Sequence, residues 1–197
     1  MEKYYFDEPQ PRVTVGDGVV LLLINGREER EVMSSMPDMD GMATTEVVER
    51  KVWVYDGVRL KTGGMTSEAA LTAAAQRLVL EEIEQHDASP SVNSFVLDGQ
   101  RVWLNFELRD RVYQGNERLK NVGREETTLW FGDKCYNMSI EQAQSIISHI
   151  EAYAKDCYNA TAQHKANVSA METVEDVLGY DYTKGYPEMI TISLREK

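Results

Sequence analysis

Two-residue turn signals divide the apolar and alternating segments of the chain into four predicted β-hairpins. The turns are expected at Asn25-Gly26, Asp56-Gly57, Asp98-Gly99 and Gly132-Asp133. Asn-Gly and Asp-Gly pairs supply the positive φ angles of a type I′ turn, and a leading glycine suits type II′. The first two hairpins lie in the N-terminal third, on either side of a polar loop at residues 34–45 that contains proline and glycine.

Helical periodicity follows these hairpins. A break at residues 62–65 precedes a helix that Thr66 or Ser67 can cap and that runs to about His86. Further helices are expected at about 106–121 and 139–166, and a shorter one after residue 168 stops at Gly179. The helix at 139–166 has the clearest apolar spacing, formed by Ile140, Ala143, Ile147, Ile150, Ala154, Cys157 and Thr161. A strand-like MITISL segment lies near the C-terminus.

The later two hairpins repeat one arrangement of an apolar run, a turn, a return strand, a helix cap and a glutamate. Segment 95–107 aligns with segment 129–141 at an offset of 34 residues. Asn and Ser are good N-caps because their side-chain oxygens accept hydrogen bonds from unpaired first-turn N–H groups. Asp98 and Gly99 are predicted to form the turn, and Trp103 to anchor the sheet beneath its helix. Asn105 and Ser139 are predicted to cap the two helices, and Trp130 belongs to the aligned apolar run.

These patterns predict an α+β protein. Residues 1–62 are expected to form a β-rich region with an extended arm at 1–11, followed by an α+β domain at 66–197. Within this domain the pseudo-repeated β-β-α units at 92–121 and 127–166 are expected to combine their hairpins, because an isolated two-stranded sheet is marginal in water. The result would be a four-stranded antiparallel sheet covered by helices.

Net charge and hydropathy limit the partners and the cellular compartment that the sequence predicts. The net charge of −12 argues against a nucleic-acid partner, because phosphate contacts require clustered Lys and Arg. The longest apolar run, at residues 19–24, is strand-sized, so no membrane partner is predicted. The N-terminus lacks a secretory signal, which indicates synthesis in a reducing cytoplasm. Cys135 and Cys157 are therefore expected to be partly buried free thiols.

Candidate catalytic groups are sparse. His149 is expected on the surface, His86 at a helix end, and His164 as a partly buried structural residue. Cys157 lies two helical turns from His164, too far for direct proton transfer. The Asp38 and Asp40 pair lacks the further oxygen ligands of a calcium loop. The sequence therefore predicts no enzyme, no cofactor and no metal.

Two aromatic groups suggest binding instead. The first comprises Tyr4, Tyr5 and Phe6, which either dock on a neighbouring subunit or fold back on their own domain. The second comprises Tyr180, Tyr182 and Tyr186, which either contact a carbohydrate or protein, or pack across the end of the sheet.

Four segments appear in order along the chain: VNSFVLDGQRVWLNFELR, TTLWFGDKCYNM, IEAYAKDCYNATAQHKANV and YDYTKGYP. They resemble a domain family of unknown function from phages and prophages of gut anaerobes, often encoded near or within tail and tail-fibre genes. The resemblance covers about residues 80–190, and Trp-Leu-x-x-x-x-Arg at 103–109 is its most specific part. After Trp-Leu the family often has Asp-Lys where this chain has Asn105-Phe106.

The resemblance implies a virion or virion-assembly role and no catalytic residues. We expect a bacteriophage structural protein, a tail, head-tail connector or fibre-associated component, made in the host cytoplasm and carried in the virion. Its partners would be other virion proteins and copies of itself. The alternatives are a tail-fibre assembly chaperone absent from the virion, an acidic decoy of a host nucleic-acid-binding protein, and a tail-borne hydrolase that uses the acidic loop.

Overall fold

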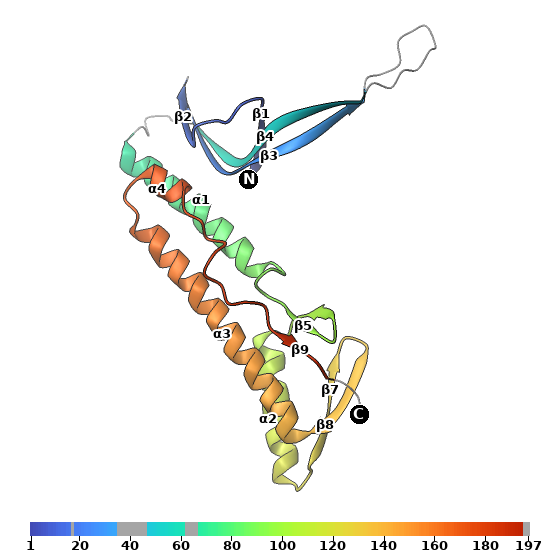
Figure 1. Cartoon of the computed structure of the whole chain (residues 1–197). Coiled ribbons are helices and arrows are strands. Elements are labelled where there is room, and N and C mark those ends of the chain that lie inside the picture. The colour runs from blue at the N-terminus through green and yellow to red at the C-terminus, as the bar shows by residue number, and fades with distance from the viewer. Residues whose placement is uncertain (17, 35–46, 62–66, 195–197) are drawn as a thin grey trace. The chain divides into compact units, whose positions relative to one another are not determined.

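The computed structural model describes residues 1–16, 18–34, 47–61 and 67–194. Helices and antiparallel sheets occur together, which confirms the predicted α+β class. The chain divides into two compact units (Figure 1). Unit 1 contains Met1–Leu80 and Val168–Tyr180, and unit 2 contains Glu81–Asn167 and Asp181–Lys197. The division falls inside the helices at 68–88 and 140–170 and again after Tyr180, whereas the domain boundary was expected at residues 61–66.

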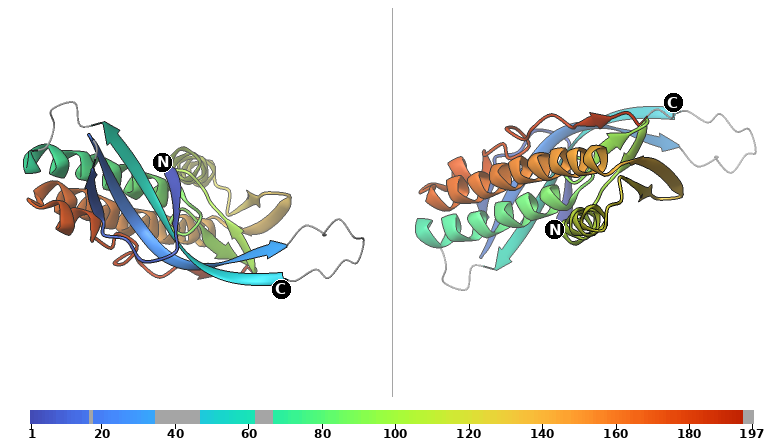
Figure 2. Two further views of the ribbon diagram at one scale, coloured as in Figure 1. Left: turned by 90° about the horizontal axis from the view of Figure 1, so that it is seen from above. Right: turned by 90° about the horizontal axis from the view of Figure 1, so that it is seen from below.

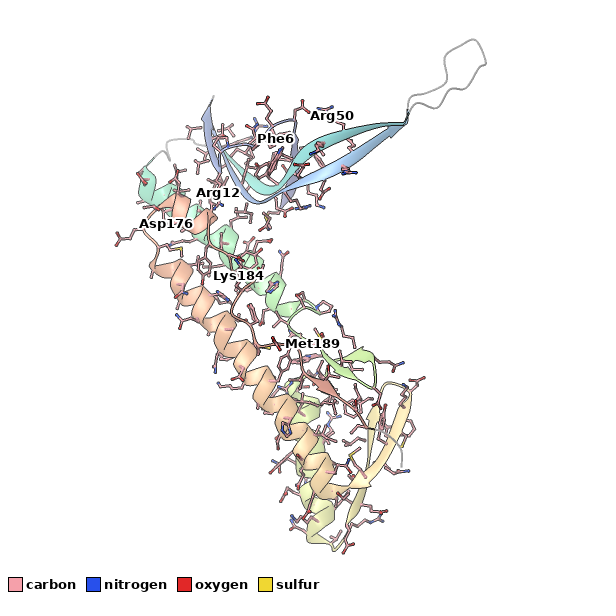
Figure 3. The ribbon with its side chains drawn as sticks, viewed as in Figure 1. Phe6, Arg12, Arg50, Asp176, Lys184 and Met189 are labelled. Atoms are coloured by element: carbon pink, nitrogen blue, oxygen red, sulfur yellow. The ribbon has the colours of Figure 1, made fainter. Side chains whose placement is uncertain are left out.

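Unit 1 contains a four-stranded antiparallel sheet in the order β1-β4-β3-β2. The strands are β1 Glu2–Phe6, β2 Val13–Gly16, β3 Val19–Ser34 and β4 Val47–Lys61. The N-terminal residues expected as an extended arm are strand β1, which pairs with β4 from Trp53 to Gly57. Figure 3 labels Phe6 and Arg50 on this sheet. Of the two alternatives for the N-terminus, the structure shows the one in which it folds back on its own sheet.

Two of the four predicted hairpin turns are wrong. Asn25-Gly26 lies inside β3 and Asp56-Gly57 inside β4, and these two strands form one long hairpin. The register shifts between Ile24 and Arg27, so Asn25 and Gly26 form a β-bulge opposite Tyr55. The predicted loop at 34–45 lies almost entirely outside the described residues, as do the break at 62–65 and Thr66.

The helical part of unit 1 is held together by side-chain contacts to backbone carbonyls. Helix α1, Glu68–Ala88, begins after Ser67, whose hydroxyl accepts from the Ala70 N–H. Gln76 of α1 donates its side-chain amide to the carbonyls of Val168 and Ser169 at the end of α3, and of Met171 just after it. These bonds pair carbonyls that a helix end leaves without intrahelical partners. Helix α3 covers Ile140–Ala170, and α4 covers Val174–Leu178 with Thr173 as its N-cap.

Unit 2 contains both predicted β-β-α arrangements. The first is β5 Phe95–Leu97, β6 Gln100–Val102 and α2 Phe106–Asn121, and the second is β7 Glu126–Phe131, β8 Lys134–Ser139 and α3. Figure 2 shows α2 beside the first part of α3 in further views. The interior of the unit is apolar, and its buried members are Phe95, Leu97, Leu129, Phe131, Met138, Ala143, Ile146 and Ile150.

The prediction that these two hairpins form one four-stranded sheet is wrong. β7 and β8 form a sheet of two strands, while β5 lies between β6 and the C-terminal strand β9, Thr191–Ile192. β9 runs parallel to β5, and the N–H groups of Val96 and Asp98 donate to the carbonyls of Ile190 and Ile192 at 2.9 and 3.0 Å. The edge of β5 that could receive the second hairpin is therefore occupied by the C-terminus.

Within the described ranges, no helix combines the length and the apolar character needed to cross a bilayer.

Candidate binding groove

The start of α2 is organised around a buried arginine. Asn105 caps the helix, since its Oδ1 accepts from the Leu108 N–H at 2.9 Å. Arg109, one turn later, is only 6% exposed. Its Nη1 donates to the Leu104 carbonyl, and its Cζ lies 5.4 Å from the Trp103 ring centroid. The Trp-Leu-x-x-x-x-Arg segment thus folds into one local cluster, in which the guanidinium lies over the tryptophan ring.

The charge of Arg109 is balanced from the neighbouring helix. Its Nε donates to Glu151 of α3 at 2.5 Å. The Glu151 side chain is 47% exposed, so the pair extends from the interior to solvent. A buried cation needs such a partner because its desolvation is costly. The pair therefore fixes how α2 lies against α3 and defines one wall of a surface groove.

The α2–α3 groove has a volume of about 440 Å³. It is lined by residues of α2 and α3, namely Phe106, Arg109, Asp110, Tyr113, Gln114, Ile147, Ser148 and Glu151. Phe106 is 65% exposed and Tyr113 is 38% exposed. Two aromatic side chains that remain accessible beside a concave surface are typical of a docking site for another chain.

Polar groups surround this apolar centre. Asp110 and Glu151 lie on its lining, and Glu117 lies outside the lining, about two turns after Asp110 along α2, where it accepts from the Gln144 side chain. The one cation on the lining, Arg109, is paired with Glu151. The groove therefore combines exposed aromatic rings with a negative rim.

The ionisable groups on the lining of the groove are Asp110, Glu151, Arg109 and Tyr113. Its lining contains no histidine or cysteine. Over the part of the chain that the structure covers, no three His, Cys, Asp or Glu residues come together in a way that could hold a metal ion. Asp38 and Asp40, the carboxylates proposed for a hydrolase, lie outside the described residues.

The predicted tyrosines of the C-terminal segment pack inside their units. In unit 2 the His86 ring lies 5.8 Å from Tyr182 and 5.2 Å from Tyr186, and the His164 ring lies 5.4 Å from Tyr186. Burial lowers the pKa of His86, and His164 lowers it further, so His86 is neutral at pH 7. Tyr180 is half-buried and belongs to unit 1.

Hydrogen bonds complete this tyrosine and histidine packing. The Thr161 hydroxyl lies 2.7 Å from Asp87 Oδ1 and 2.9 Å from the Tyr186 hydroxyl, and Tyr182 donates to Glu82 at 2.9 Å. Burial raises the pKa of Tyr186, so it remains a neutral donor. Tyr182 and Tyr186 thus contact the C-terminal half of α1, and Tyr186 also contacts the C-terminal half of α3, which is a structural role.

Cys157 is part of the interior and does not form a dyad with His164. Its thiol and the Tyr153 hydroxyl both point to the Val92 carbonyl, at 3.9 and 3.2 Å. Burial raises the pKa of Cys157 and brings that of Tyr153 to about 12. A buried thiol with a raised pKa is a poor nucleophile. Cys135, by contrast, is exposed, so the prediction of two partly buried thiols is wrong for this residue.

The remaining predicted residues have mixed outcomes. Asp98 and Gly99 have φ angles of +46° and +80° in the β5–β6 turn, and Ser139 accepts from the Gln142 N–H at 3.1 Å. Trp103 packs against the interior of unit 2. Trp130, expected as a structural residue, is 64% exposed, because strand alternation buries its neighbours Leu129 and Phe131.

The first strand leaves one of its aromatic residues accessible. Phe6 packs edge-on against Tyr55 with a centroid distance of 5.9 Å. Tyr4 is half-buried and its hydroxyl donates to Glu2 at 2.8 Å. Tyr5 is 61% exposed, so it alone of the three keeps most of its surface for a partner.

The sequence did not identify Phe106 or Glu151 as candidate residues. The spacing from Trp103 to Arg109 was a signal for the local cluster, since it places the arginine one helical turn after the cap. Glu151 lies 42 residues beyond Arg109, and no local pattern connects the two.

No family model matches this chain, and neither a curated protein nor a solved structure is significantly similar to it.

Proposed function

We propose that this protein is a non-enzymatic component of a phage particle, or of its assembly, and that the α2–α3 groove binds a basic amphipathic helix of another virion protein. The phage setting comes from the sequence resemblance. The binding mode comes from the groove, and the single observation that carries it is the exposure of Phe106 and Tyr113 beside a concave surface with a negative rim.

An amphipathic helix fits both properties of the groove. Phe106 and Tyr113 offer apolar surface for side chains three or four residues apart on one face of such a helix. A volume of about 440 Å³ accepts the side chains of a short segment, while the rest of the partner remains outside.

The charge of the rim selects the partner. Asp110, Glu117 and Glu151 would lie beside the polar face of a docked helix, so Lys and Arg on that face are favoured over Asp and Glu. The net charge of −12 on the whole chain acts in the same direction at longer range.

The binding mode is testable with a synthetic helix of leucine and lysine as the probe, measured by calorimetry at two salt concentrations. The double variant Phe106→Ala and Tyr113→Ala keeps every charge of the chain. It should weaken binding by about tenfold or more, because a buried aromatic side chain contributes roughly 1.5–3 kcal/mol.

Tyr158→Ala is the matched control, since Tyr158 is 63% exposed on α3 and lies outside the groove lining. It should bind the probe as the wild type does. Equal loss in both variants, or equal affinity for a helix of leucine and glutamate, would contradict the groove proposal.

The phage setting is tested separately by mass spectrometry of purified virions. A copy number in multiples of a tail or portal symmetry supports a structural part, and absence with retained binding to a tail-fibre protein supports the assembly chaperone. If purified particles lack the protein and no virion protein binds it, the setting is wrong. Salt-sensitive binding to a host nucleic-acid-binding protein would then support the acidic decoy.

A further inference from the structure

The long β3–β4 hairpin of unit 1 extends beyond the strands that flank it. β2 pairs with β3 only from Val19 to Leu22, and β1 pairs with β4 only from Trp53 to Gly57. Beyond these points β3 and β4 continue together as far as the pair of Ser34 with Val47 (Figure 1). Within the described residues, the outer edge of β3 at 27–31 has no strand beside it.

This edge carries a charge order that is complementary to itself. The five residues are Arg27, Glu28, Glu29, Arg30 and Glu31. If two copies of the segment run antiparallel with Glu29 opposite Glu29, each arginine lies opposite a glutamate of the other copy. Arg27 faces Glu31, and Glu28 faces Arg30, on both sides of the two-fold axis.

We propose that two copies of this chain pair through the outer edges of their β3 strands, antiparallel and centred on Glu29. Directly opposed residues of an antiparallel pair lie about 4.5–5.5 Å apart, so opposite charges in these positions attract. The contact forms on both faces of the ribbon, because residues 27, 29 and 31 point to one face and residues 28 and 30 to the other. The proposal is independent of the function proposed for the α2–α3 groove.

The same charges specify the register. A slip of one residue in one direction places Arg27 opposite Arg30 and Glu28 opposite Glu29, so like charges meet at each of these positions. A slip in the other direction keeps Glu29 opposite Arg30 but places Glu28 opposite Glu31, so it too creates like pairs that the centred register avoids. In the centred register the one like pair is Glu29 with its own copy. This pair is relieved within each chain, because Arg27 Nε lies 2.5 Å from Glu29 Oε1.

Geometry limits the assembly to two copies. The bulge at Asn25 and Gly26 ends the regular edge on one side of the segment. An antiparallel contact between identical edges closes on itself about a two-fold axis and does not propagate. The opposite edge of the ribbon belongs to β4, where Arg50 pairs with Asp7 and Lys51 pairs with Glu28, and charged side chains of this kind discourage further strand addition.

The arrangement also explains why so polar a ribbon remains extended. Glu28, Glu29, Arg30 and Glu31 of β3 are all exposed, and on β4 the buried apolar residue opposite them is Val52, the partner of Glu29. Isolated two-stranded ribbons are marginal in water, whereas two paired ribbons form four strands.

Charge reversal tests the proposal on the intact chain. Light scattering with size-exclusion chromatography should give twice the chain mass of 22.4 kDa for the wild type. Glu28→Arg or Arg30→Glu alone creates two like pairs across the axis, and each variant should run as a monomer. Mixing the two single variants restores opposite charges between positions 28 and 30 on both sides of the axis, so they should form a heterodimer together.

Glu188→Arg is the matched control, because Glu188 is exposed in unit 2 and should leave the dimer intact. Circular dichroism verifies that each variant is folded, and heterodimer formation on mixing verifies it independently. A wild type that is monomeric at all concentrations, single variants that stay dimeric, or a mixture that stays monomeric would each overturn the proposal.

A crosslink at the axis gives a second test. Glu29→Cys, made in a Cys135→Ser background to remove the exposed thiol, places two thiols opposite each other at a spacing that a disulfide spans. Mild oxidation should convert the protein to a covalent dimer. Glu188→Cys in the same background should remain monomeric under denaturing, non-reducing electrophoresis. Equal crosslinking of both variants would mean that copies meet by chance and not through β3.

Discussion

Asp98-Gly99 and Asn25-Gly26 are dipeptides of the same kind, and both follow apolar strand residues. The chain reverses at the first, in the two-residue turn between β5 and β6, and continues through the second, inside β3. Both begin with a left-handed residue, since Asp98 has φ of +46° and Asn25 has φ of +54°. The local preference for a left-handed residue is thus satisfied in both regions, although only one of them is a turn.

The glycines make the difference. A Cβ added at Gly99 would meet nothing within 4 Å, so space does not require glycine at this position. Its φ of +80° does, because other residues rarely adopt this conformation. Gly26 has no positive φ, but its missing Cβ leaves the space that the Tyr55 ring fills. Tyr55 is buried, and its hydroxyl accepts from the Gln10 N–H at 3.0 Å. The same dipeptide therefore provides a turn in one region and room for a tyrosine in the other.

Asp56-Gly57 adds a third case. Neither residue has a positive φ, and Gly57 lies in the middle of the sheet with Leu23 on one side and Glu2 on the other. A Cβ at Gly57 would lie 2.6 Å from the Leu22 carbonyl oxygen and 2.9 Å from Leu23 Cδ2. Here glycine allows close approach of the backbone of β3.

Gly57→Ala should have the largest effect on stability. The closest atom is a backbone oxygen of the sheet, which cannot turn away as a side chain can, so we expect a loss of about 3 kcal/mol. Urea denaturation measures the loss, and amide hydrogen exchange should place it in peptides of β3 and β4. Gly16→Ala is the control, because a Cβ at Gly16 of the same sheet has open space, and it should change stability by less than about 0.5 kcal/mol.

Gly26→Ala should cost less, about 2 kcal/mol, because the group in its way is the Tyr55 ring and not the backbone. The ring can move, but it then loses its bond with Gln10. A double-mutant cycle tests this cause: in a Tyr55→Leu background the same substitution should cost about 0.5 kcal/mol or less. An unchanged cost in that background would mean that the bulge itself, and not the ring, requires glycine.

These three dipeptides show what the sequence could and could not predict. The type I′ turn at Asp98-Gly99 was predictable because both strands it joins are short and complete within a few residues. The bulge at Asn25-Gly26 was not, because β3 continues only if a second long strand is available to pair with it. That strand is β4, whose residue Val54 lies opposite Arg27. Pairing between distant segments thus outweighed the local turn preference.

The same limit applies to unit 2 and its groove. The bounds of α2 and the caps Asn105 and Ser139 follow from local spacing, and the structure agrees with them. The failure of the two hairpins to share a sheet depends on β9, which reaches β5 from the far end of the chain. Glu151 is similarly remote from Arg109. The sequence thus predicted helix bounds and caps, which depend on neighbouring residues, but not contacts between segments that are remote along the chain.

Gly99→Ala should cost about 1 kcal/mol, because alanine pays for a left-handed conformation even where there is space for its Cβ. Gly115→Ala is an informative control. Gly115 lies in α2, also with open space, and alanine is the better helix former, so the same substitution should stabilise by about 0.5–1 kcal/mol. Equal signs for the two variants would mean that space, and not φ, governs both positions.

Asn25→Gly should have the smallest effect, within about 0.5 kcal/mol of the wild type. Glycine adopts the left-handed conformation of this position without strain, which offsets the loss of the 3.3 Å hydrogen bond from Asn25 Nδ2 to Asp56. Asn25→Val, in contrast, puts a β-branched residue at a φ of +54° and should lose about 1–2 kcal/mol. Urea denaturation of the two variants separates the cases. If valine is tolerated as well as glycine, the backbone at the bulge is not left-handed, and the parallel with Asp98 no longer holds.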